Sequence, residues 1–152
     1  MIKFKEIGTY KVAQNIGYLT TPVVLKNGMG VTYDLAKKIV ALPTVTTAKG
    51  DVAIVMNTID KPEIKAPNEF KIEIGENPRI FPLKALNGHT LQMDTDAVTT
   101  EYASIAEGNT LTLGTDGKWV VNATLTDYAT YLKVVEKTNF GGAGLDVVVV
   151  VA

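Results

Sequence analysis

The 152-residue chain contains no cysteine and only one histidine and one tryptophan. Without cysteine, the chain can form no disulfide framework, no thiolate nucleophile and no cysteine-ligated zinc site. Charged residues are also sparse and balanced, with 15 Lys and Arg against 16 Asp and Glu. Because affinity for nucleic acid comes mainly from clustered basic residues that displace counterions, we expect no nucleic-acid partner.

Long hydrophobic runs are missing as well. The longest apolar run, residues 147–151, is far shorter than the ~20 residues that a membrane-spanning helix requires. We therefore expect no membrane partner, and we interpret this run as a buried strand or a subunit interface. Residues 1–19 lack the continuous apolar segment and the cleavage site of a secretory signal, which predicts a chain made in the cytoplasm and left unprocessed.

What the chain does contain favours β-structure. Hydrophobic residues make up 46% of it and charged residues 20%, as in a folded protein. Thr and Val, which favour strands, supply about a quarter of the residues. In the C-terminal third, alternation predicts strands at residues 110–113, 118–122 and 131–136, joined by tight turns and followed by the valine run. This part of the chain is predicted to be an antiparallel sheet.

The N-terminal half shows a similar order of short strands and turns. Strands are predicted at residues 22–25, 30–34, 37–42 and 51–57. The pair Asn27-Gly28 supplies residues that accept a positive φ angle, and residues 34–38 fit a hairpin loop better than a helical turn.

The two halves also match each other at an offset of 80 residues without gaps. Eight identities fall within about thirty residues, which indicates a structural repeat. The matching residues are Gly28, Thr32, Lys38, Val40, Thr44, Thr46, Val55 and Thr58 in the first half and Gly108, Thr112, Lys118, Val120, Thr124, Thr126, Val135 and Thr138 in the second.

The middle of the chain is interpreted as a linker followed by a central hairpin. Residues 59–68 contain two prolines, and proline cannot donate to a strand ladder. Residues 69–74 alternate as a half-buried strand does. Asn87-Gly88 lies between residues 80–86 and 89–94 and predicts a hairpin with a type I′ turn. Residues 94–102 are predicted to be a loop or a short helical turn.

The first 19 residues carry apolar side chains at irregular spacing. Two interpretations remain open: a first strand at the edge of the sheet, or an arm that folds against a partner. A free, solvated tail would be more polar. The candidate partner-binding residues of this arm are Ile2, Phe4, Ile7, Tyr10, Val12, Ile16 and Tyr18.

Together these patterns predict an all-β fold with minor helix. We expect two related small β-barrel or sandwich modules with hairpins, preceded by an extended N-terminal arm. The expected divisions are residues 1–19 for the arm, 20–60 for module 1, 61–103 for the linker and central hairpin, and 104–152 for module 2.

No pattern of residues predicts catalysis. His89, beside the Asn-Gly turn, fits a solvated turn residue, and the glycines at 141, 142 and 144 precede a strand where a phosphate cradle would open a helix. Asp94 and Asp96 lack the glycine and distal glutamate of a calcium loop. Trp119 is expected in the core, with an exposed aromatic platform as the alternative. We therefore expect no enzyme activity, cofactor or metal.

One resemblance rests on the order of features at residues 105–151: EGNTLTLG, DGKW, a Thr-rich stretch, YLKVVEKTNFGG and a closing valine strand. This order resembles the C-terminal module of the decoration, or cement, proteins of tailed bacteriophages, and VVLKNGMGVTYD followed by TAKGDVAIVMN is similar in style. The family does not require the repeated halves found here. The resemblance implies a protein without an active site that binds the outer surface of the virion capsid, bridges subunits of the major capsid protein and stiffens the shell. A homotrimer would gain affinity by engaging several subunits at once.

A second hypothesis is a carbohydrate-binding or host-surface-binding β module of a head or tail fibre. It requires Trp119, Tyr128 or Tyr131 to be exposed to a ligand.

Overall fold

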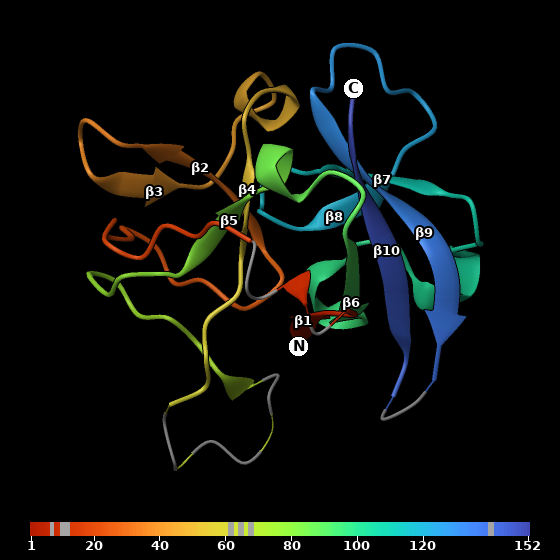
Figure 1. Ribbon diagram of the computed structural model, residues 1–152, viewed down its shortest axis with the longest axis horizontal. Helices are drawn as coiled ribbons and strands as arrows, with labels where there is room; N and C mark the ends of the chain where they lie inside the picture. The colour runs from red at the N-terminus through yellow and green to blue at the C-terminus, as the bar shows by residue number, and fades with distance from the viewer. Residues whose placement is uncertain (7, 10–12, 61–62, 64–65, 67–68, 140–141) are drawn as a thin grey trace.

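The computed structural model describes the chain except residues 7, 10–12, 61–62, 64–65, 67–68 and 140–141. The described residues form ten strands in two antiparallel sheets, with several short 3₁₀ helices between them (Figure 1). The predicted all-β class with minor helix is confirmed.

The larger sheet has six strands in the order β1-β6-β10-β9-β7-β8. Its longest members, β9 and β10, form an antiparallel pair, and a register shift lies between Asp146 and Val147. The bounds are β1 Ile2–Phe4, β6 Thr90–Asp94, β7 Thr110–Leu113, β8 Trp119–Val121, β9 Thr130–Thr138 and β10 Gly144–Val151.

The smaller sheet has four strands in the order β3-β2-β4-β5 and lies on the opposite side of the molecule from β9 and β10 (Figure 1). Short 3₁₀ helices lie in the connections between strands. The bounds are β2 Gly30–Asp34, β3 Ile39–Ala41, β4 Ala53–Val55, β5 Ile80–Pro82, η1 Thr47–Lys49, η3 Leu83–Leu86, η4 Thr95–Ala97 and η5 Tyr102–Ser104.

The two sheets repeat one strand plan. In each, a hairpin (β2–β3 or β7–β8) is followed by a strand that pairs with the first hairpin strand (β4 or β9), and then by a strand that pairs with that one (β5 or β10). The turns before the hairpins match as well: Gly28 N–H donates to Val55 O and Gly108 N–H to Val134 O, both at 2.8 Å. The strands therefore lie where the internal match places them.

The register refines the offset between the halves. Thr32 pairs with Ala41, whereas Thr112, which lies 80 residues after Thr32, pairs with Val120. Ala41 thus corresponds to Val120, 79 residues away. The same offset of 79 relates β4 to β9, because Val31 pairs with Ala53 and Leu111 with Leu132. One residue fewer separates these strands, so an ungapped comparison finds only part of the repeat.

Single bridges extend both sheets at their edges. Ile16 pairs antiparallel with Ile80 of β5, and Thr20 lies parallel to Ile39 of β3. In the larger sheet, Val98 lies parallel to Trp119 of β8 in the same way. In both halves, a segment that precedes the hairpin therefore covers the edge of its second strand.

Two buried clusters form the core, and one of them is shared. Val31, Ala53, Val55 and Ile80 face a cluster within the N-terminal half, which Phe70 and Ile72 help to cover among other residues. The opposite face of the same sheet joins the cluster of the larger sheet. That face contributes Val52, Ile54, Met56, Phe81 and Leu83, which share this cluster with Leu111, Leu132, Val134, Leu145, Val147 and Val149.

The predicted hairpin at Asn87-Gly88 is wrong. Asn87 has φ −53° and ψ 127°, Gly88 has φ 79°, and His89 N–H donates to Leu86 O, which describes a type II turn. The flanking strands β5 and β6 belong to different sheets, and residues 83–86 form η3, with Leu83 and Leu86 buried. The chain crosses between the sheets at this point and does not fold back on itself.

Two other predicted strands are reduced to one bridge. Residues 22–25 and 69–74 contribute only the pair Leu25 and Ile72. Phe70 and Ile72 are buried as predicted, but Ile74 is 67% exposed and lies in a turn. Alternation placed Phe70, Ile72 and Ile74 on one buried face, which is correct for the first two and wrong for Ile74, because the backbone turns before a ladder can form.

Candidate functional site

The start of the predicted partner-binding arm, residues 2–4, is built into the body of the molecule. Ile2 and Phe4 are buried in the shared core, where β1 pairs antiparallel with β6. The Phe4 ring meets the Phe81 ring edge-on, with 5.2 Å between centroids. For residues 2–4, the structure therefore agrees with the first interpretation, a strand at the edge of the sheet.

Lys5 continues this attachment after β1 ends. Its Nζ donates to Asp146 Oδ2 at 2.5 Å, and the Asp146 carboxylate is almost fully buried. The hydrogen bond and the negative charge of Asp146 raise the pKa of Lys5 above its ordinary value. The other carboxylate oxygen, Oδ1, has no hydrogen-bond partner among the described residues.

The remaining predicted arm residues have different surroundings. Ile16 is half-buried against the cluster of the smaller sheet. Tyr18 is 58% exposed, and the parallel bridge between Thr20 and Ile39 places it beside the β2–β3 turn, where Leu35 is also exposed. Ile7, Tyr10 and Val12 lie outside the described residues. Among the predicted arm residues that the structure describes, Tyr18 offers a partner the most exposed side chain.

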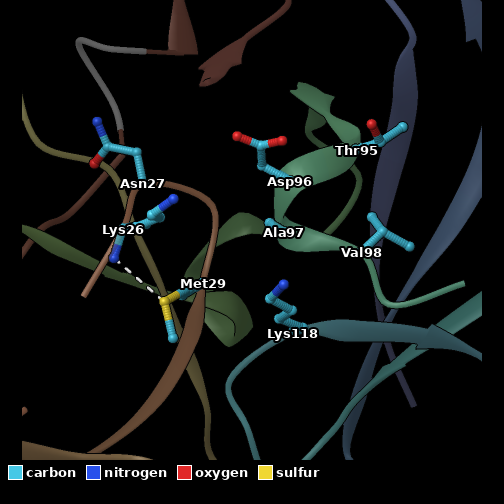
Figure 2. A pocket seen from close by; sticks show the side chains of 8 residues that line it. All are labelled: Lys26, Asn27, Met29, Thr95, Asp96, Ala97, Val98 and Lys118. Carbon is cyan, nitrogen blue, oxygen red and sulfur yellow. Dashed lines mark hydrogen bonds between the residues drawn. The ribbon is translucent and has the colours of Figure 1, made fainter. Parts of the chain in front are cut away.

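A pocket of about 370 Å³ lies at the junction of the two sheets (Figure 2). The turn before β2 contributes Lys26, η4 contributes Asp96, and Lys118 comes from the β7–β8 turn. Two ammonium groups and one carboxylate suit an anionic or zwitterionic group. No histidine is present among its described lining residues. Sequence reasoning missed this pocket, because its residues come from three distant segments that share no motif.

Trp119 is fully buried in the shared core. Its indole Nε1 donates to the carbonyl of Gly28 at 2.9 Å and so joins the larger sheet to the turn that opens the smaller one. The expectation of a core tryptophan is confirmed, and Trp119 cannot serve as an exposed platform in this structure.

His89 is half-buried and within hydrogen-bonding distance of a hydroxyl, with 3.3 Å between its Nδ1 and Thr9 Oγ1. His89 was expected to be a solvated turn residue, and its partial burial and its contact with Thr9 differ from that prediction. A general base also needs a carboxylate to orient it. No His89–carboxylate contact is present among the described residues.

The other candidate positions have structural roles. Asp94 caps η4 by accepting a hydrogen bond from the Asp96 N–H. Gly144 begins β10, so the described part of the glycine-rich loop leads into a strand. Within the described segments, no cluster of three or more His, Cys, Asp or Glu is placed to hold a metal ion. None of the described helices has the length and apolar character that a membrane crossing requires.

Comparison with known proteins adds no relative: no protein-family model, curated protein or solved structure matches the chain.

Proposed function

We propose that this protein is a non-enzymatic structural protein of a virion, which binds the outer surface of a tailed-phage capsid and stabilises it by bridging subunits of the major capsid protein. The proposal rests on the resemblance of residues 105–151 to phage decoration proteins and on the architecture of the chain.

The observation that carries the proposal is the fusion of two similar sheets into one rigid body. Besides the shared core, backbone hydrogen bonds join the halves: Gly30 N–H donates to Gly117 O and Ala129 N–H to Lys49 O, both at 2.8 Å. A bridging protein must transmit load between the subunits that it contacts. A body whose halves share a core and are joined by backbone hydrogen bonds suits this role, because separating the halves would expose apolar side chains and break the bond between the buried Gly30 and Gly117.

Tyr18 is the residue that we propose for contact with the shell. Aromatic side chains are enriched among the residues that dominate binding energy. Tyr18 and Leu35 are both exposed, and the Thr20–Ile39 bridge brings the segment that carries Tyr18 to the β2–β3 hairpin that carries Leu35. Ile2 and Phe4 are buried, so we do not propose them as contacts with the shell. Their burial only fixes where the N-terminal segment starts.

The test is co-sedimentation of the purified protein with expanded empty heads of the phage that encodes it. We expect saturable pelleting at a fixed ratio to the capsid subunit. A protein that stays in the supernatant at all concentrations would contradict the proposal.

A matched pair of variants tests the contact residue. Tyr18→Asp is expected to weaken head binding by about tenfold or more, as loss of a dominant aromatic contact does. Val45→Asp is the control, because Val45 is 72% exposed and lies in the loop after β3. Equal binding by the two variants would remove Tyr18 from the interface and leave the capsid proposal standing.

The second candidate, a glycan-binding or host-surface module, loses its strongest residue with the burial of Trp119. Tyr128 and Tyr131, both half-buried, are the aromatic residues left to it. Specific binding on a glycan array, lost on substitution of either tyrosine, would favour this candidate over capsid binding.

A further inference from the structure

The internal repeat places equivalent faces of the two sheets in different surroundings. Pairing across the strands matches Ile54 and Phe81 of the smaller sheet with Lys133 and Val148 of the larger one, since Ile54 pairs with Phe81 and Lys133 with Val148. The same register matches Val52 with Tyr131 and Leu83 with Val150.

In the smaller sheet this face is buried. Val52, Ile54, Phe81 and Leu83 are between 0% and 2% exposed, and they lie in the cluster that the larger sheet shares. Gly30 lets the sheets approach closely, because a Cβ atom there would lie 2.4 Å from Leu113 Cδ1. Within the chain, this apolar face is therefore kept from water by packing against the related sheet.

In the described structure, the equivalent face of the larger sheet is only partly covered: Asp146 is 1% exposed, whereas its other members are half-buried or exposed. We call it the outer β9–β10 face and define it by Tyr131, Lys133, Val135, Glu136, Asp146, Val148 and Val150. Tyr131, Val148 and Val150 are half-buried, and Val135 is 50% exposed. In a stack of related units, the end units normally carry a polar outer face. Four of these seven side chains are apolar, so this end is less polar than an end unit normally is.

The opposite end of the stack is closed. The other face of the smaller sheet, which carries Val31, Ala53 and Ile80, is covered within the chain, in part by Phe70 and Ile72 from the long β4–β5 connection. In the larger sheet, β9 and β10 follow each other after only five residues, 139–143, so no such connection exists. A second copy cannot continue the stack head to tail, because the surface it would need is already occupied.

The outer β9–β10 face carries charges of both signs, and within the chain Lys5 Nζ lies 2.5 Å from Asp146 Oδ2 and 3.8 Å from Glu136 Oε2. Lys133 and Glu136 lie on β9, and their partners Val148 and Asp146 place both on the side opposite Val147. Both side chains are exposed. Two copies related by a twofold axis across β9 would bring Lys133 of each copy toward Glu136 of the other, as an isologous interface requires.

We propose that the outer β9–β10 face is a contact surface between two copies of this chain, packed like face to like face. The inference is independent of capsid binding. It gives pairs of molecules, in contrast to the trimer that the family resemblance implies.

The first test is the mass of the full-length protein in solution, measured by light scattering after size exclusion over a wide range of concentrations. We expect a concentration-dependent dimer. Val148→Lys should raise the dimer dissociation constant by about tenfold or more, because it places an unpaired charge in the contact. Ile74→Lys is the control, since Ile74 is 67% exposed and lies at the closed end.

A charge exchange tests the like-to-like geometry. Lys133→Glu alone should weaken the dimer, and adding Glu136→Lys in the same chain should restore it. Circular dichroism of each variant checks that the fold persists. A protein that stays monomeric, a dimer insensitive to Val148→Lys, a trimer or open-ended chains, or a double variant no stronger than Lys133→Glu would each overturn the proposal.

Discussion

At the scale of single residues, Asp146 is the charged residue that is buried among the described residues. It is 1% exposed and sits at the register shift between β9 and β10. A buried charge that loses its partner is strongly unfavourable. Lys5, which comes from the start of the chain, supplies that partner and so makes the position of the N-terminal segment matter to the centre of the sheet.

Replacing Lys5 should therefore reduce stability in a pH-dependent way. Lys5→Met is expected to lower the melting temperature at neutral pH. The pKa of Lys5 is raised above its ordinary value of 10.5, so its stabilisation is complete below that pH and is lost as pH rises through the raised value.

The measurement is thermal unfolding of both proteins from neutral to alkaline pH, where the difference in melting temperature should shrink above about pH 10.5. Lys3→Met, in the preceding strand β1 and exposed, is the control and should change little. A difference that stays constant with pH would show that Lys5 acts through packing and not through charge.

At the scale of elements, the two hairpin-opening turns give an internal comparison. Gly28 and Gly108 have φ angles of 93° and 86°, and both donate to the equivalent strand. Their surroundings differ, however. A Cβ atom at Gly28 would lie 2.9 Å from Ala97 Cβ, whereas nothing lies within 4 Å at Gly108.

Alanine at the two positions should separate backbone strain from crowding. Gly108→Ala is expected to destabilise by about 1 kcal/mol, because alanine disfavours a positive φ angle. Gly28→Ala should cost about 2 kcal/mol or more, because overpacking adds to the same strain. Equilibrium unfolding in urea measures both, and equal losses would mean that η4 moves aside freely.

At the scale of the whole molecule, the two halves are not independent domains. The face of the smaller sheet that carries Ile54 and Phe81 packs into the core of the larger sheet, and the Trp119 indole donates a hydrogen bond to the Gly28 carbonyl. The strands β5 and β6 complete different sheets although both lie within the segment expected to be a linker and central hairpin. Neither half can bury its apolar residues alone.

Unfolding should therefore be a single transition. Calorimetry of the full chain is expected to give equal calorimetric and van't Hoff enthalpies, as for two-state unfolding. A fragment of residues 104–152 lacks β6 and the covering sheet, so its circular dichroism should show no stable fold. A folded fragment, or two separate transitions, would establish that the halves are autonomous.

Much of the larger sheet could be predicted from sequence. The strand expected at residues 110–113 is β7, and residues 118–122 and 131–136 contain or overlap β8 and β9. Here, strict alternation and glycine turns agree with the local backbone. The repeat was visible because the halves keep their turn residues, such as Gly28 and Gly108, at equivalent positions.

Other features depend on contacts that a sequence does not show. Asn87-Gly88 has the composition of a hairpin turn, but the burial of Leu83 and Leu86 carries the chain into another sheet. The apolar spacing of residues 1–19 did not distinguish core residues from partner contacts, and Ile2 and Phe4 turn out to be core. The junction pocket joins Lys26, Asp96 and Lys118, which only the tertiary fold brings together.

The position of β10 has a consequence for biosynthesis. It lies between β6 and β9 in the larger sheet, yet residues 144–151 follow every other strand in the chain. While the ribosome is still adding residues 95–143, β6 has no neighbour on the side that β10 will take, and an unpaired strand edge is prone to wrong association. The order of synthesis thus leaves the larger sheet open until its central strand arrives.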